Sequence, residues 1–334
     1  MSALWKRRQS GNPQLDAFPR CSVYSKDALE RSCSSSTSCS EFGAVPFISC
    51  PNLHNFRTSQ RRVQLPSEYD VLEVLGQGAA GKVLRARKPD GVEVAIKIMQ
   101  ANDEEELRGR RREFDILSTL SHPHLVKALD FLQSDFQAAV VLSYHPGQSL
   151  DLAVKGQAFP ERIARRLFHQ LMSAISYLHQ QRVLHRDIKA ENILVSPNHQ
   201  NMHLADFNTA KAVHDGGALT MTGTMEYSAP EVLDGNSPSH GQDVWGCGLC
   251  LHMMLSARLP QRLHSFSSLE AFASAQRSYP VKWQHLRNCT PACKAVVSHC
   301  LCVDEMSRPS AAEIFAMEWT SESSDLSESE LVEA

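Results

Sequence analysis

The sequence predicts an α+β fold in which a β-rich half precedes a mostly helical half. Between residues 69 and 100, short runs of apolar and β-branched residues are separated by glycines and by the turn Pro89-Asp90-Gly91, which is typical of antiparallel strands. Beyond residue 147, apolar residues recur at helical spacing instead. A run of strands followed by a run of helices indicates two lobes of different architecture.

The individual elements follow in order along the chain. We expect strands over 69–75, 82–86, 92–99 and 140–144, and a helix over 103–120. In the second half, Pro160 opens a helix with an apolar stripe from Ile163 to Leu178, which indicates packing against a core rather than a site. Further helical segments are expected over 243–257, 267–277 and 291–319.

One folded region over residues 67–319 is expected, with a first lobe over 67–145 and a second over 146–319. Residues 1–66 contain a Ser/Cys-rich run and nine Lys or Arg against four Asp or Glu. This composition predicts a disordered basic segment, either a solvated tail or a docking arm. Residues 320–334 are acidic and serine-rich, and we expect a second disordered tail there.

Composition argues against several classes of function. A net charge of -3 gives no basic field for nucleic acid, and no apolar run approaches the ~20 residues of a membrane helix. The ten cysteines do not form a secreted disulfide framework, so we expect a cytoplasmic or nuclear protein. No CxxC pair is present among Cys289, Cys293, Cys300 and Cys302, which predicts buried helix cysteines rather than zinc ligands.

The most informative motif is an eight-residue run that precedes an acidic motif. Its residues are His185-Arg186-Asp187-Ile188-Lys189-Ala190-Glu191-Asn192, and Asp206-Phe207-Asn208 follows. Together they offer a carboxylate for an acceptor hydroxyl, a cation for a transferring phosphoryl group and oxygen ligands for magnesium. This combination indicates phosphoryl transfer from a magnesium-bound nucleotide.

A glycine-rich loop lies near the start of the β-rich half. Its residues are Gly76-Gln77-Gly78-Ala79-Ala80-Gly81. Dinucleotide-binding folds use the same glycines but continue into a helix, whereas Val83 to Ala86 here reads as a strand. We therefore expect a β-hairpin whose backbone amides approach phosphate oxygens closely.

Lys97 ends the strand Val94-Ala95-Ile96-Lys97 between apolar neighbours. Such a lysine either extends its ammonium to solvent from a strand edge or pairs with a carboxylate inside a cleft. Glu113, on the helix of the β-rich half, is the expected partner.

From Gly76 to Arg308 the chain resembles the eukaryotic protein kinases. Besides the motifs above, it shares Ala229-Pro230-Glu231, Asp243-Val244-Trp245-Gly246-Cys247-Gly248 and Arg308 with that family. The resemblance implies the two-lobed protein kinase fold, with ATP and Mg as cofactors. A monomer acting on protein substrates, under control of an upstream kinase, is expected.

The resemblance also assigns a role to each motif residue. Asp187 would orient the acceptor hydroxyl and Lys189 would steady the phosphoryl group, while Asn192 and Asp206 would hold magnesium. Lys97, held by Glu113, would bind phosphates. The remaining nucleotide contacts implied are the glycine loop, Val83, Ala95, Leu142, Ser143, His145 and Leu194.

Specificity and regulation follow from the same resemblance. Lys189 and Thr224 are typical of serine/threonine kinases rather than tyrosine kinases. Thr220 would receive an activating phosphate that Arg186 and Lys211 bind, with Thr222 or an unmodified loop as alternatives. Glu191 would give a mild preference for a basic residue before the acceptor, unless its role is structural.

Asn208 departs from the family because it replaces a glycine after Asp206-Phe207. Asparagine adopts positive φ more readily than most residues, so the change is compatible with an active enzyme. Two hypotheses follow: a magnesium-dependent Ser/Thr protein kinase, or a pseudokinase that scaffolds or regulates a partner. A small-molecule kinase is disfavoured by the activation segment from Asp206 to Glu231.

Overall fold

A computed structural model describes residues 69–78, 81–134, 137–206, 211–212, 225–237 and 239–321. The chain divides into two units, Met1–Thr58 and Ser59–Ala334, and every described residue belongs to the second. The segments predicted to be disordered, 1–66 and most of 320–334, lie outside the described residues. Thr320 and Ser321 belong to a terminal helix.

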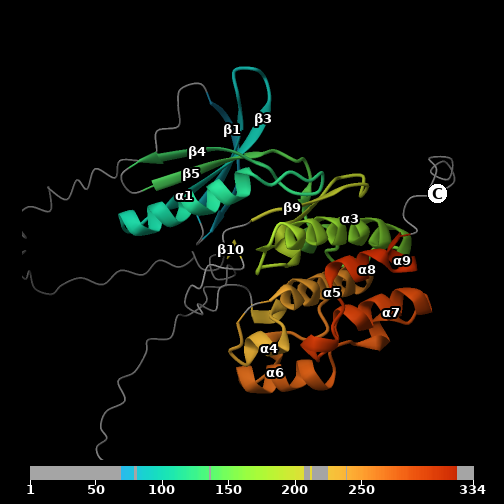
Figure 1. Ribbon diagram of the computed structural model, residues 1–334. Coiled ribbons are helices and arrows are strands. Elements are labelled where there is room, and N and C mark those ends of the chain that lie inside the picture. Colours follow the sequence, from blue (N-terminus) through green and yellow to red (C-terminus); the bar gives the residue numbers. More distant parts are fainter. Residues whose placement is uncertain are drawn as a thin grey trace, which may run out of the picture. The chain divides into compact units, whose positions relative to one another are not determined.

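The first lobe is a five-stranded antiparallel sheet with one helix against it (Figure 1). Its strand order is β1-β2-β3-β5-β4. The strands are β1 (Asp70–Gly78), β2 (Gly81–Arg87), β3 (Glu93–Gln100), β4 (Ala128–Ser134) and β5 (Gln137–Ser143). The antiparallel opening is as predicted, but β4 was not expected from the sequence. Its Asp130, Gln133 and Ser134 interrupt the apolar pattern that identifies a strand.

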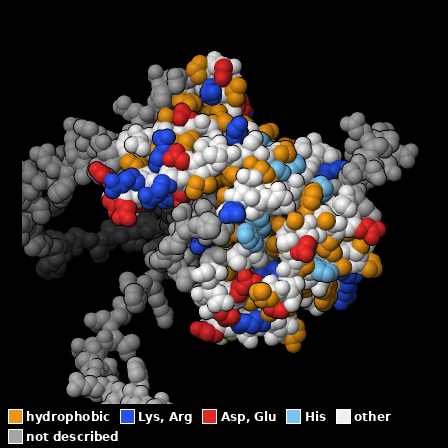
Figure 2. Space-filling view, in the orientation of Figure 1, with side chains coloured by type: hydrophobic (Ala, Val, Ile, Leu, Met, Phe, Trp, Pro, Cys, Tyr) orange, Lys and Arg blue, Asp and Glu red, His pale blue; other side chains and the backbone are white. Residues whose placement is uncertain are grey.

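Helix α1 (Glu104–Ser118) is fixed at its start and along one face. Asp103 caps it by accepting a hydrogen bond from the backbone N–H of Glu106 at 2.8 Å. Phe114 packs on Phe131 of β4, with ring centroids 5.5 Å apart. Charged side chains of both signs cover the outer face (Figure 2). The helix is therefore held on the sheet by its apolar face.

The second lobe is mostly helical (Figure 1). Its helices are α2 (Leu150–Ala153), α3 (Glu161–Gln180), α4 (Pro230–Leu233), α5 (His240–Ser256), α6 (Leu269–Ser278), α7 (Pro291–Cys300), α8 (Ala311–Ala316) and α9 (Glu318–Ser321). Short strands support the site: β6 (Gln148–Ser149), β8 (Ile193–Val195) and β9 (Met202–Leu204) form one sheet, and β7 (Val183–Leu184) pairs with β10 (Lys211–Ala212).

The helical stretch expected over 291–319 is divided into α7, α8 and α9. Pro309 cannot donate a helical hydrogen bond, which favours a break there. Ser310 then starts α8 with a capping box, in which its side chain and that of Glu313 each bind the other's backbone N–H.

Helix α5 forms the centre of the second lobe, and the run from His185 to Asn192 lies against it. Trp245 and Leu251 are fully buried, and Gly246 lies against Ile188. A Cβ added at Gly246 would lie 2.9 Å from the carbonyl oxygen of Ile188. The helix thus approaches the backbone of residue 188 at a distance that only glycine allows.

A buried ion pair connects α4 to the segment before α8. Arg308 Nη1 lies 2.6 Å from Glu231 Oε1, and Nη2 donates to Oε2 at 3.0 Å. The same guanidinium donates to the carbonyl oxygens of Cys302 and Gly241 and stacks on Trp245. Because both charges are paired and hydrogen-bonded, the pair is compatible with burial.

Among the described helices, none combines the length and the apolar character that a bilayer-spanning segment needs.

We expect Arg308→Ala to destabilise the protein by about 3–5 kcal/mol, because it leaves the Glu231 carboxylate buried without its cation. The matched control is Arg277→Ala, which removes the exposed ion pair with Asp234 and should cost under ~1 kcal/mol. Urea unfolding followed by circular dichroism measures both. Equal losses would contradict the structural role of the buried pair.

Candidate active site

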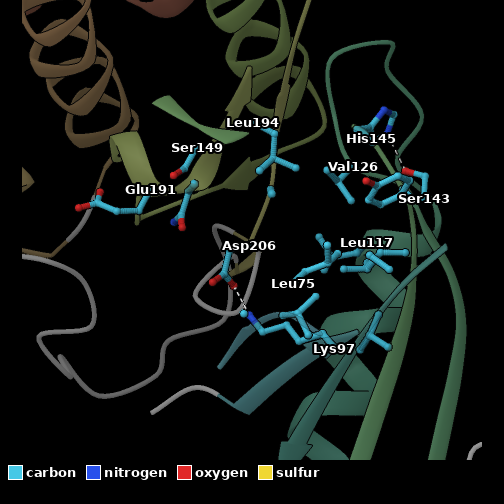
Figure 3. Close-up of a pocket in the computed structure, with 18 of the residues that line it drawn as sticks. Leu75, Lys97, Leu117, Val126, Ser143, His145, Ser149, Glu191, Leu194 and Asp206 are labelled. Carbon is cyan, nitrogen blue, oxygen red and sulfur yellow. Dashed lines mark hydrogen bonds and ion pairs between the residues drawn. The ribbon is translucent and has the colours of Figure 1, made fainter. Parts of the chain in front are cut away.

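A cavity of about 470 Å³ lies between the β-sheet lobe and the segment from Ser143 to Asp206 (Figure 3). It is lined by nine of the predicted nucleotide-binding residues, by both predicted magnesium ligands and by Glu191. Those nine are Gly76, Val83, Ala95, Lys97, Glu113, Leu142, Ser143, His145 and Leu194. The sequence motifs are therefore brought together around one cavity.

The remaining members of the predicted glycine loop do not all line the cavity. Ala79 and Ala80 lie outside the described residues, and the described lining excludes Gln77 and Gly81. Gly81 has a φ of +120°, and a Cβ there would lie 2.1 Å from Ile98 O. This glycine is thus required by the close approach of β3, a reason that differs from the one expected from the sequence.

Several apolar lining residues were not anticipated. They are Leu75, Met99, Phe114, Leu117, Val126, Val140 and Leu152. Leu75 directly precedes the glycine loop, so its position in the sequence was a usable signal. Val126 and Leu117 come from segments with no motif, and only the fold brings them to the cavity.

The segment that joins the lobes is held by side-chain hydrogen bonds and ring stacking. Ser143 Oγ accepts from the Lys127 backbone N–H at 2.9 Å and lies 2.9 Å from His145 Nε2. The His145 ring stacks on His203 with centroids 3.5 Å apart. Burial, with His145 and His124 nearby, lowers the pKa of His203 to about 4, and burial also lowers the pKa of His145. Both rings are therefore neutral at pH 7.

The catalytic run is anchored from below by Asp243 of α5. Its Oδ2 accepts from the His185 backbone N–H at 3.0 Å, and its Oδ1 accepts from that of Arg186 at 2.8 Å. His179 Nε2 lies 2.9 Å from Oδ2. Burial opposes ionisation, but the bonds from His179 and Arg186 outweigh it, so the pKa of Asp243 is lowered. A buried charge of this kind is tolerable because it is fully hydrogen-bonded.

The two predicted catalytic residues and one predicted magnesium ligand meet immediately after this anchor. Lys189 Nζ lies 2.7 Å from Asp187 Oδ2. Asn192 Nδ2 donates to the carbonyl oxygen of Asp187 at 2.8 Å and to Oδ2 at 3.1 Å. Because the amide nitrogen of Asn192 is directed at Asp187, its amide oxygen is the atom left to bind a cation.

The expected pairing of Lys97 with Glu113 differs from the structure. Lys97 Nζ lies 2.7 Å from Asp206 Oδ1 (Figure 3), while Glu113 Oε2 lies 3.8 Å from Arg110 Nη1, one turn earlier on α1. At 2.7 Å the Coulomb attraction between the Lys97 ammonium and the Asp206 carboxylate is strong. Lys97 and Glu113 nevertheless both line the cavity, as predicted.

Several sequence predictions fall on residues that the structure does not describe. Phe207, Asn208, Thr220, Thr222 and Thr224 lie outside the described residues. For Lys211 the backbone is described: in the β10–β7 pair it lies opposite Leu184. Leu184 precedes Arg186 by two residues in the chain.

Arg186 and Glu191 lie on either side of the catalytic residues. Arg186 has a φ of +69°, and its buried Nε has no hydrogen-bond partner among the described residues. Burial raises the pKa of Glu191, and the nearby Asp151 and Asp187 raise it further. The Arg186 guanidinium thus has a hydrogen bond still to be made within the described structure.

Comparison with known proteins assigns this architecture. The family described as protein kinase domain matches residues 69–320. The chain is 32% identical over 265 residues to the carbon catabolite-derepressing protein kinase of Saccharomyces cerevisiae, which covers 75% of this chain and 40% of that protein. It is 37% identical over 203 residues to NUAK family SNF1-like kinase 2 of Homo sapiens, which covers 59% of this chain and 32% of that protein.

The chain spans about two fifths of the length of the curated yeast relatives it matches. The two-lobed fold and the resemblance predicted from the motifs are confirmed by the family match and by the arrangement of sheet and helices. The chain belongs to the protein kinase family, and its folded region is a protein serine/threonine kinase domain.

Proposed function

We propose that this protein transfers the terminal phosphoryl group of magnesium-bound ATP to serine or threonine hydroxyls of protein substrates. One observation carries the proposal. Asp187, Lys189 and Asn192 form a hydrogen-bonded cluster with contacts of 2.7–3.1 Å, and the cavity beside it contains the Lys97–Asp206 pair. This set positions an acceptor and neutralises phosphate charge, the two tasks that phosphoryl transfer requires.

Each of the site residues has a distinct task in that reaction. Asp187 accepts the proton of the acceptor hydroxyl, and the ammonium of Lys189 stabilises negative charge on the transferring group. Lys97 binds phosphate oxygens. The apolar walls formed by Val83, Ala95 and Leu194 enclose the adenine ring.

The donor set fits magnesium. The carboxylate of Asp206 and the amide oxygen of Asn192 are hard oxygen ligands of the kind this ion prefers, and both line the cavity. When bound, magnesium neutralises charge on the phosphate oxygens. Asn192 is preoriented for this role, since two hydrogen bonds to Asp187 fix its amide plane.

We further propose regulation by phosphate on the activation segment, with Thr220 as the preferred acceptor and Thr222 as the second candidate. The support is the unpaired buried Nε of Arg186 within the described structure and the placement of Lys211 opposite Leu184. A phosphate bound by these cations would form charge-assisted hydrogen bonds. It would thereby order the segment beside Asp187.

Asp187→Asn should lower the rate of phosphoryl transfer by at least about 10²-fold, because the base is lost. The measurement is incorporation of radiolabelled phosphate from ATP into a protein substrate, after phosphate on Thr220 has been verified by mass spectrometry. Asp90→Asn, on the exposed turn before β3, is the matched control and should leave the rate unchanged. Absence of activity in the phosphorylated wild type would favour the pseudokinase alternative suggested by Asn208.

Thr220→Ala should prevent activation by an upstream kinase and lower activity by about tenfold or more, since charge-assisted hydrogen bonds of about 1.5–3 kcal/mol are lost. Arg186→Gln should cause a similar loss even when Thr220 carries phosphate. Thr222→Ala is the matched control and should activate normally. Loss of activation only in Thr222→Ala would transfer the role to that residue.

Glu191→Gln should lower the rate on peptides with arginine two residues before the acceptor by up to about fivefold, as an ion pair worth up to ~1 kcal/mol is removed. Peptides with alanine at that position should be phosphorylated equally by both proteins. A degenerate peptide array provides the comparison. If wild-type rates do not depend on that arginine, the role of Glu191 is structural.

A further inference from the structure

A second group of reactive side chains lies apart from the phosphoryl-transfer cavity. Glu161 is the first residue of α3, Cys289 precedes α7, and Cys293 lies in its first turn. One carboxylate oxygen and the two sulfurs all lie within 4.8 Å of one another. Among the described residues that line the nucleotide cavity, none belongs to this group.

The Glu161 carboxylate is held in one orientation by three donors. Oε1 accepts from Thr290 Oγ1 at 2.6 Å and from Trp319 Nε1 at 2.7 Å. Oε2 accepts from the Thr290 backbone N–H at 2.8 Å. Within the described structure this leaves one lone pair of Oε2 for a further partner. Carboxylates that bind metals are typically oriented by hydrogen bonds of this kind.

Thr290 also orients one of the thiols. It is the N-cap of α7, and its Oγ1 accepts from the Cys293 backbone N–H at 3.2 Å. One residue therefore fixes both Glu161 and the turn that carries Cys293. Cys293 is buried, whereas Cys289 and Glu161 are partly exposed, so an ion could reach the group from solvent.

We propose that Cys289, Cys293 and Glu161 bind one zinc ion, with a water molecule as the fourth ligand. A tetrahedral ion with Zn–S bonds of ~2.3 Å requires sulfurs about 3.8 Å apart. Atoms already within 4.8 Å of one another need to approach by about 1 Å at most to meet that requirement. Binding would release the two thiol protons to solvent.

Ligand chemistry distinguishes this site from the magnesium site. Thiolates select zinc and other soft ions, whereas magnesium prefers oxygen ligands. The carboxylate supplies negative charge beside the thiols, which favours a cation between them. The ion would join the start of α3 to the start of α7, two helices that are distant in sequence, and would thereby stabilise the helical lobe.

The site could not be predicted from the sequence, because Glu161 lies far from Cys289 and Cys293 along the chain. Cys289 and Cys293 alone are spaced as CxxxC, and the absence of a CxxC pair among the four cysteines from 289 to 302 predicted buried helix cysteines. Cys300 is indeed buried, and neither it nor Cys302 belongs to the group. Only the fold places Glu161 beside the two thiols.

The test uses the full chain, reduced, freed of metal with a chelator and then titrated with zinc against a chromophoric chelator. We expect one zinc more per chain in the wild type than in Cys289→Ser or in the double variant Cys289→Ser/Cys293→Ser. A hundredfold excess over Kd should raise Tm by about 5 °C in the wild type but not in these variants. Cys302→Ser is the matched control, with wild-type binding and shift.

Two further measurements do not require the double variant to fold. Cobalt titrated into the wild type should give a thiolate charge-transfer band that weakens in Cys289→Ser, whose thiol is partly exposed. Glu161→Gln should weaken zinc binding by about tenfold or more. Equal zinc stoichiometry in wild type and Cys289→Ser would overturn the proposal. It would also be overturned by a Cys289–Cys293 disulfide, seen as a two-hydrogen mass loss on mild oxidation, in a protein that binds no zinc when reduced.

Discussion

The arrangement of the run from His185 to Asn192 depends on one buried carboxylate, that of Asp243. It accepts hydrogen bonds from two successive backbone N–H groups, at His185 and Arg186, and is itself bound by His179. These hydrogen bonds hold Arg186 at a φ of +69°. This left-handed conformation costs a non-glycine residue roughly 1–2 kcal/mol. The turn so produced places Asp187 where Asn192 donates hydrogen bonds to its carbonyl oxygen and to Oδ2.

Much of the fold and of the site could be predicted because the motif residues lie in short, ordered segments. Asp187, Lys189 and Asn192 are separated by few residues, so their meeting needs only one local turn. The strands of the first lobe carry clear turn signals, and α3 carries a clear apolar stripe. Local patterns of this kind do not depend on the remainder of the chain.

The features that escaped prediction are set by tertiary contacts. Strand β4 is recognised only by its pairing with β5, since its polar residues obscure its period. The partner of Lys97 depends on where α1 places Glu113 relative to Asp206, which no spacing encodes. The same reasoning applies to Glu161, whose neighbours Thr290 and Trp319 come from two other helical segments.

Gly246 has a consequence for how α5 supports the loop above it. At this point the helix presents no side chain, and a Cβ there would meet the Cβ, the Cγ2 and the carbonyl oxygen of Ile188. The Cβ and the carbonyl oxygen of Ile188 cannot move away through a change of side-chain rotamer, because the backbone fixes both atoms. The distance between α5 and Ile188, in the run from His185 to Asn192, therefore depends on the absence of a side chain at Gly246.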